Sequence, residues 1–200
     1  AIGNGPHAMS ALQPAFAVVG VSKQYGGVAA LHDVSVQVRP GEIVGIIGTN
    51  GAGKTTLFDV CSGFLKPEHG RVFMAGEDIT ALAPSQRASR GLGRVFQDAR
   101  LFPAMTVADA IATACEQHVA VRDPIACTLG LAAAKESEAE IHAKAGNLLR
   151  DMGLERFRDS FVSELSTGTR RILEFSCLLA HEPKVLLLDE PTSGIAQRES

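Results

Sequence analysis

The segment best suited to chemistry is Gly48-Thr49-Asn50-Gly51-Ala52-Gly53-Lys54-Thr55. It fits the pattern G-x-x-x-x-G-K-[ST], in which a glycine-rich turn between a strand and a helix cradles the phosphates of a nucleoside triphosphate. The glycines leave backbone N–H groups uncovered, and the helix start adds a positive end that favours anions. A solvated lysine on an ordinary β-to-α turn is the alternative for this motif alone. The candidate nucleotide-binding residues are Asn50, Gly51, Gly53, Lys54, Thr55 and Thr56.

Roles follow from the pattern for three of these residues. Lys54 is predicted to reach the β- and γ-phosphates, and the Thr55 hydroxyl is predicted to ligate magnesium. Thr56 is expected near the α-phosphate. The predicted ligands are therefore ATP and Mg²⁺.

Two acids, Asp189 and Glu190, follow the apolar run 185–188. The run is typical of a parallel strand buried on both faces, and open α/β sheets bind ligands at the carboxyl ends of their strands. Asp189 therefore looks like the Walker B acid, which holds magnesium through water opposite Thr55. Glu190 is the candidate that polarises the attacking water, as a general base or as a positioning group. Two acids that only cap a strand end are the alternative.

The elements that must position these residues alternate between strands and helices. Thr106, with Asp109 three residues later, predicts a helix start, and Gly63 and Gly153 predict helix ends. We expect an α/β fold: a P-loop NTPase core with a mostly parallel sheet and helices, an N-terminal antiparallel β subdomain, and an inserted helical subdomain over about 98–180. Strands are predicted over 16–21, 33–38, 43–47, 71–74, 93–96 and 184–188, and helices over 54–62, 84–90, 107–118, 135–152 and 170–180.

Composition narrows the class of protein. The net charge is −3, the pI is about 6.1 and no Lys/Arg block occurs, so no nucleic-acid partner is expected. The four scattered cysteines indicate reduced, mostly buried thiols of a cytosolic protein. The apolar runs are too short to cross a bilayer, so a membrane role requires a partner chain. We interpret residues 1–10 as a cloning remnant and 11–200 as a single domain.

The stretch Leu165-Ser166-Thr167-Gly168-Thr169 resembles the L-S-G-G-Q signature of the ATP-binding-cassette (ABC) ATPases. It departs from the signature at Thr167 and Thr169, where the family has Gly and Gln. It retains Ser166 and Gly168, which the family presents to the γ-phosphate of ATP bound on the other subunit. Ordinary helix capping by a serine is the alternative.

Other positions extend the resemblance over about residues 16–200. Gln97 matches the Q-loop glutamine, which implies that its amide contacts magnesium or the attacking water; an exposed glutamine is the alternative. Tyr25 stands where the family has an aromatic that stacks on adenine, although it could pack on its own sheet. The stretch 191–196 aligns with the D-loop, but Ala196 replaces the usual Asp.

The resemblance implies an ATP-binding and ATP-hydrolysing subunit or domain of an ABC transporter. Such a subunit works as a head-to-tail dimer with a second ABC ATPase subunit and couples to a transmembrane permease subunit, at the cytoplasmic face of the plasma (inner) membrane. The stretches 94–97 and 101–107 look most like ATPases of branched-chain or hydrophobic amino acid uptake. The alternatives are a soluble non-transport ABC ATPase and another P-loop NTPase. Neither a basic stripe nor an Asn-Lys-x-Asp motif supports them.

Two further expectations concern the loop after Gln97 and the end of the chain. Leu101, Phe102, Pro103 and Met105 are expected either to dock on the permease or to anchor the helical subdomain. The resemblance also implies a switch histidine on the strand after Walker B, and the sequence shows no histidine beyond Glu190. We therefore expect this chain to lack the C-terminal switch-histidine region, to bind nucleotide and to hydrolyse it weakly.

Overall fold

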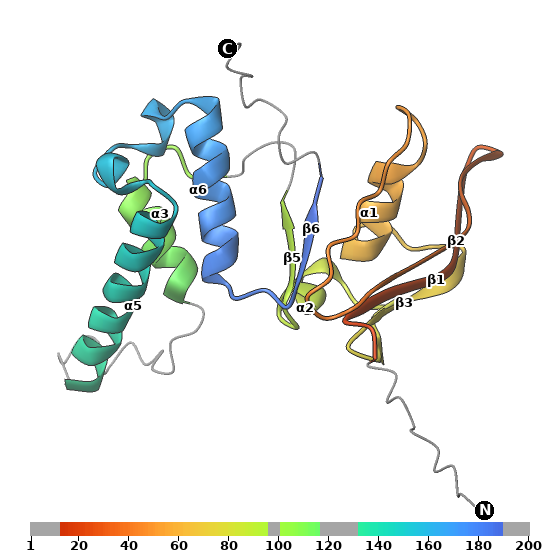
Figure 1. Ribbon diagram of the computed structural model, residues 1–200, viewed down its shortest axis with the longest axis horizontal. Coiled ribbons are helices and arrows are strands. Elements are labelled where there is room, and N and C mark those ends of the chain that lie inside the picture. The colour runs from red at the N-terminus through yellow and green to blue at the C-terminus, as the bar shows by residue number, and fades with distance from the viewer. Residues whose placement is uncertain (1–12, 96–100, 117–131, 190–200) are drawn as a thin grey trace, which may run out of the picture. The chain divides into compact units, whose positions relative to one another are not determined.

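The computed structural model describes residues 13–95, 101–116 and 132–189. The chain divides into two compact units, one ending at Ser89 and the other beginning at Arg90. The first contains an antiparallel sheet with a helix beside it, and the second contains a parallel strand pair and a group of helices (Figure 1).

The first unit is built on a four-stranded antiparallel sheet with the order β2-β1-β3-β4. Both β1 and β2 extend beyond their predicted ends because the Gly26-Gly27 turn joins them as one long hairpin. Helix α1 lies beside this sheet (Figure 1). The elements are β1 (Phe16–Tyr25), β2 (Val28–Val38), α1 (Lys54–Ser62), β3 (His69–Met74), β4 (Glu77–Asp78) and α2 (Pro84–Ala88). The buried residues of these elements include Val18, Val21, Leu57, Val60, Val72 and Ile79.

The strand predicted over 43–47 is not formed. Residues 42–49 adopt no regular secondary structure, and Ile43 and Ile47 are each 97% exposed. A strand exists only through hydrogen bonds to a neighbour, and the sheet of the first unit is antiparallel throughout. The described parallel strands belong to the second unit, so the first unit by itself offers this apolar run no parallel partner.

The second unit pairs β5 (Leu92–Val95) in parallel with β6 (Val185–Leu188). Gly93 allows helix α6 to approach this pair closely, since a Cβ there would lie 2.9 Å from Leu178 Cδ1. Helices α3, α5 and α6 pack side by side (Figure 1) around a common apolar cluster. They span Val107–Cys115, Ala132–Asp151 and Thr167–Ala180, and the short 3-10 turns η2 (Glu155–Phe157) and η3 (Val162–Glu164) precede α6.

Helix ends follow the predicted signals closely. Thr106 caps α3 by accepting a hydrogen bond from the Asp109 N–H (3.1 Å), and Gly63 ends α1 in the left-handed conformation (φ 84°). The predicted start of α6 at residue 170 is wrong: the helix begins at Thr167 because Ser166 supplies an N-cap. The stretch 120–130 and His118 lie outside the described residues.

The cysteines behave as buried thiols. Cys61 and Cys115 are buried thiols that form no disulfide with another described cysteine. Burial raises the pKa of the Cys177 thiol to about 12, so this group stays protonated at physiological pH. Cys127 lies outside the described residues. In the part of the chain that the structure describes, no helix is both long and apolar enough to span a bilayer.

Leu173 of α6 is fully buried, whereas its neighbour Ile172 is exposed, so the two residues test the packing of the helical cluster. Leu173→Ala should lower the free energy of unfolding by about 2–5 kcal/mol, because it removes buried methylene groups and leaves a cavity. Ile172→Ala is the matched control and should change it by roughly 0.5 kcal/mol or less. Urea unfolding followed by circular dichroism measures both, and equal losses would contradict the packing described.

Candidate functional site

The glycine-rich loop owes its shape to two left-handed glycines. Gly51 and Gly53 have φ of 82° and 84°. A Cβ on Gly53 would lie 2.2 Å from the Ala30 carbonyl oxygen of β2, whereas one on Gly51 would meet nothing within 4 Å. Glycine is therefore required at position 53 for two reasons: its left-handed backbone conformation and the close approach of β2.

Helix α1 begins with its backbone donors uncovered. Its N-cap is Gly53, no side chain accepts from its first turn, and that turn contains no acidic residue. In contrast, Thr106 and Ser166 cap α3 and α6 with hydroxyl oxygens. The N–H groups at the start of α1, together with the helix dipole, therefore form a candidate anion site, and no side chain among the described residues caps it.

The ammonium group of Lys54 lies against the loop that precedes it. Its Nζ donates to the carbonyl oxygens of Gly48 (2.7 Å) and Thr49 (2.9 Å). An ammonium has three donors, and these bonds use two of them. Lys54 thus fastens the loop to α1 and brings a positive charge to the anion site. Asn50 and Thr55 are exposed and Thr56 is half-buried, in the loop and in the first turn of α1.

Tyr25 ends β1 at the tip of the first hairpin and is half exposed. Lys23 Nζ lies 5.9 Å from its ring centroid and also pairs with Glu68 Oε1 at 3.2 Å. The hydrogen bond from Lys23 lowers the pKa of the Glu68 carboxyl, so Glu68 stays charged. The ring is not packed away in the sheet, and its exposed surface remains available for stacking.

In the second unit, Ser166 is the N-cap of α6. Its oxygen accepts from the Thr169 N–H (3.2 Å) and lies 2.9 Å from Thr169 Oγ1, so the capping alternative is realised. Capping uses one lone pair of the Ser166 hydroxyl oxygen. It leaves Ser166 at the start of the helix, close in sequence to Gly168 in the first turn. Arg170 turns back and donates to the carbonyls of Val162 and Ser163.

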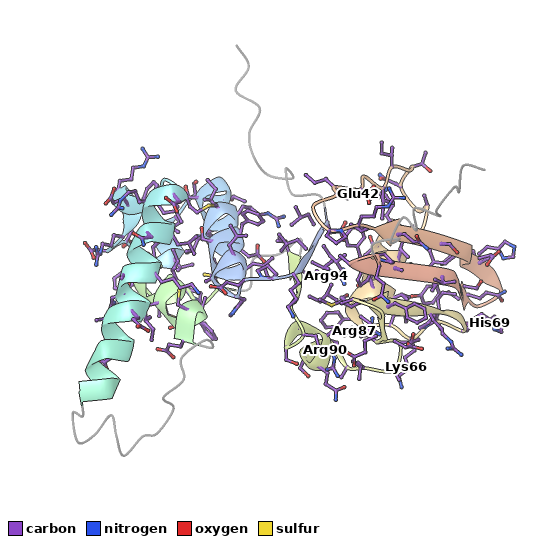
Figure 2. The ribbon with its side chains drawn as sticks, turned by 60° about the horizontal axis from the view of Figure 1, so that its bottom comes forward. Glu42, Lys66, His69, Arg87, Arg90 and Arg94 are labelled. Carbon is purple, nitrogen blue, oxygen red and sulfur yellow. The ribbon has the colours of Figure 1, made fainter. Side chains whose placement is uncertain are left out.

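Asp189 follows β6 and lies 3.8 Å from Arg94 NH2 on the neighbouring strand β5, and both side chains are nearly buried, at 12% and 8% exposure. Figure 2 labels Arg94. Sequence reasoning gave Arg94 no role. The sequence did contain a signal for this role, because an arginine inside an apolar strand is a buried charge that needs a partner. Asp189 is thus a mostly buried side chain with a cationic neighbour.

Two predicted site residues, Gln97 and Glu190, lie outside the described residues, as does Ala196. The first unit brings together the residues of the glycine-rich loop on one helix start. Ser166, Gly168 and Asp189 belong to the second unit, where Ser166 and Gly168 share one helix start. Arg87, in α2, was also missed by sequence reasoning, and its sequence neighbourhood gives no signal of its burial.

Comparison with known proteins assigns the family. A family model described as ABC transporter matches residues 31–193, which include the glycine-rich loop, the signature stretch and Asp189. The chain belongs to the ABC transporter family. The resemblance inferred from the motifs and the predicted α/β P-loop fold are both confirmed, and the protein is the ATP-binding, ATP-hydrolysing subunit of such a transporter.

Individual relatives of this ABC ATPase belong to different transport systems. LivG of Salmonella typhimurium, a high-affinity branched-chain amino acid transport ATP-binding protein, is 35% identical over 94% of this chain and 73% of its own length. LptB of Acidithiobacillus ferridurans, from a lipopolysaccharide export system, is 39% identical over 86% of this chain and 65% of its own. A nucleotide-free cassette of an ABC transporter matches with a TM-score of 0.72 and 30% identity, over 92% of this chain and 72% of that structure.

The two left-handed glycines of this ABC ATPase give a matched pair of variants. Gly51→Ala should cost about 1–2 kcal/mol of unfolding free energy, the usual cost of a left-handed alanine. Gly53→Ala should cost clearly more and weaken ATP binding, because its methyl group would overlap the Ala30 carbonyl. Urea unfolding and ATP titration measure both effects. Equal losses from the two variants would show that β2 does not constrain the loop.

Proposed function

We propose that the chain binds magnesium-ATP at the start of α1 and hydrolyses it to drive amino acid uptake. The observation that carries this proposal is the uncapped, acid-free first turn of α1 after two left-handed glycines. Such a turn leaves several N–H donors for phosphate oxygens. Lys54, already held against the loop, keeps a donor for the β- and γ-phosphates.

The remaining groups complete a magnesium-nucleotide site. Tyr25 offers a half-exposed ring for stacking on adenine. Thr55 and Asp189, with Gln97, are the protein groups that would hold magnesium. Their hard oxygen donors fit this ion, which takes one or two protein ligands beside phosphate oxygens and water. Bound there, magnesium neutralises charge on the transferring phosphoryl group.

Hydrolysis is assigned to Glu190 and Gln97, which orient the attacking water in line with the γ-phosphate. Ser166 and Gly168 are proposed to serve the ATP bound to a second ABC ATPase subunit in a head-to-tail dimer. The start of α6 supports this role, because its first turn contains no acid and Arg170 lies beside it. Closure of the dimer would then follow ATP binding.

The cargo is proposed to be a branched-chain or hydrophobic amino acid. Both LivG and BraF of Pseudomonas aeruginosa, the latter 32% identical, are branched-chain amino acid transport proteins and match 94% of this chain. A second candidate is lipopolysaccharide export, favoured by the higher identity to LptB over a shorter match. The permease that copurifies with the chain distinguishes the two.

The permease is proposed to contact the loop 101–106 at the cytoplasmic face of the inner membrane. Phe102 is 73% exposed, whereas its neighbour Leu101 packs against the helical cluster. Leu101 thus anchors the helical subdomain, and the exposure of Phe102 supports the proposal that this residue docks on the permease. The loop also connects to the signature, since the N–H groups of Val162 and Ser163 donate to the carbonyls of Met105 (2.9 Å) and Pro103 (3.1 Å).

Nucleotide binding is tested by thermal unfolding. At a hundredfold excess of magnesium-ATP over Kd, binding should stabilise the chain by about 2.7 kcal/mol, or a Tm increase of roughly 5–10 °C for a chain of this size. Lys54→Ala should remove most of the increase because it removes the ammonium donor. No increase in the parent, or a full one in the variant, would contradict the proposed site.

Permease docking is tested at Phe102. Phe102→Ser should reduce copurification with the cognate permease and leave ATP affinity unchanged, because the ring is exposed and distant in sequence from the glycine-rich loop. Phe64→Ser is the control, since Phe64 is also exposed but belongs to the first unit. If Phe102→Ser lowers ATP affinity and copurification equally, its role is structural and docking at this loop is rejected.

A further inference from the structure

Arg87 is a buried arginine at the C-terminal end of helix α1, whose N-terminal end is the proposed nucleotide site. It extends from α2 (Figure 2) and is 1% exposed. Its guanidinium donates four hydrogen bonds, all to backbone carbonyl oxygens: Leu82 (3.1 Å), Val60 (2.7 Å), Cys61 (2.7 Å) and Thr80 (2.9 Å). Burial of a charged group is costly unless it is fully hydrogen-bonded, so these contacts define one position for the side chain.

Two of the four acceptors belong to the last turn of α1. The carbonyls of Val60 and Cys61 lie at the end of the helix, where they carry the negative end of its dipole, and the Val60 carbonyl also accepts from the Gly63 N–H (3.2 Å). Arg87 NH1 binds both. A single charged group therefore caps the C-terminus of the helix whose N-terminus follows the glycine-rich loop.

The other acceptors connect this cap to the antiparallel sheet. Thr80, whose carbonyl accepts from Arg87, uses its own hydroxyl to accept from the Val72 N–H of β3 (2.8 Å). Leu82 lies in the turn that leads to α2. The guanidinium thus ties the end of α1 to the sheet through backbone groups on both sides.

Gly63 provides the space for this arrangement. It ends α1 with φ 84°, and a Cβ there would lie 2.8 Å from Arg87 Nε and 2.9 Å from the Leu82 carbonyl oxygen. The guanidinium therefore fits closely against the helix end. Burial lowers the pKa of the Arg87 guanidinium, but an arginine starts so high that it stays charged at neutral pH.

We propose that Arg87 is a positioning residue for nucleotide binding: by fixing the C-terminal end of α1 against the sheet, it fixes the first turn that receives the phosphates. This inference rests on the proposed nucleotide site. Nine helical residues span only about 14 Å, so a change of tilt at one end displaces the amides at the other. If α1 can tilt, a smaller fraction of the molecules has its first turn in the position that binds ATP, and the apparent affinity for ATP falls in proportion.

The test is titration of the full chain with ATP in excess magnesium, by calorimetry, at a temperature where circular dichroism shows each variant to be folded. Arg87→Met keeps most of the side-chain stem but loses the charge and all four hydrogen bonds. We expect Kd to rise about tenfold, which corresponds to 1.4 kcal/mol of lost preorganisation. Arg87→Lys restores the charge but not the planar fork, so its Kd should lie between those of Arg87→Met and the parent. Arg71→Met, at an exposed arginine of β3, is the control and should keep the parent Kd.

The outcomes separate this inference from the proposed function. A parent chain that does not bind ATP overturns both. A parent that binds, with a folded Arg87→Met of unchanged Kd and reduced unfolding free energy, assigns Arg87 a purely structural role and overturns only the inference. If Arg87→Met does not fold, the Arg87→Lys variant is measured instead. A Kd of Arg87→Lys above that of the parent supports the positioning role, and a Kd equal to that of the parent rejects it.

Discussion

The start of α1 must leave its backbone donors without side-chain partners, and much of the first unit follows from this constraint. A helix usually satisfies its first N–H groups with a side-chain cap, as α3 and α6 do here. Helix α1 has no such cap, and in the proposed function phosphate oxygens would take its place. The helix must then be held by other means: Gly53 packs against β2, Leu57 and Val60 are buried, and Arg87 binds the last turn.

Arg87 and Arg94 are two largely buried arginines, and their charges are stabilised differently. Arg87 is surrounded by carbonyl dipoles, whereas Arg94 lies beside the Asp189 carboxylate. Loss of one member of a buried pair leaves the other charge uncompensated, which is often more destabilising than replacing both by apolar groups. Substitutions at Asp189 are therefore expected to change stability as well as the proposed metal binding. Their effect on ATP hydrolysis has to be separated from an effect on folding.

The second unit links the proposed permease contact to the signature by short hydrogen-bonded steps. The loop containing Pro103 and Met105 bonds to residues 162–163, and Arg170 at the start of α6 bonds to the carbonyls of the same two residues. Ser166 lies between them in sequence. Displacement of the loop by a membrane partner would therefore act on the start of α6, so the proposed coupling can pass through backbone hydrogen bonds and the Arg170 side chain.

Local residue patterns were sufficient for much of this protein. The glycine-rich loop, the cap at Thr106, the helix end at Gly63 and the family were all predictable, because each depends on residues close in sequence that impose a conformation or present a fixed set of donors. The sequence also marked Ser166 as a helix start, although it placed α6 three residues too late. Tertiary structure alone decided the partners of Arg87 and Arg94, the difference between Gly51 and Gly53, and the fate of the apolar run 43–47. These outcomes depend on which backbone groups or charges, distant in sequence, come within a few ångströms in the fold. Hydrophobic periodicity does not contain this information. A strand in particular requires a neighbour, so its sequence can favour the extended conformation without determining the pairing.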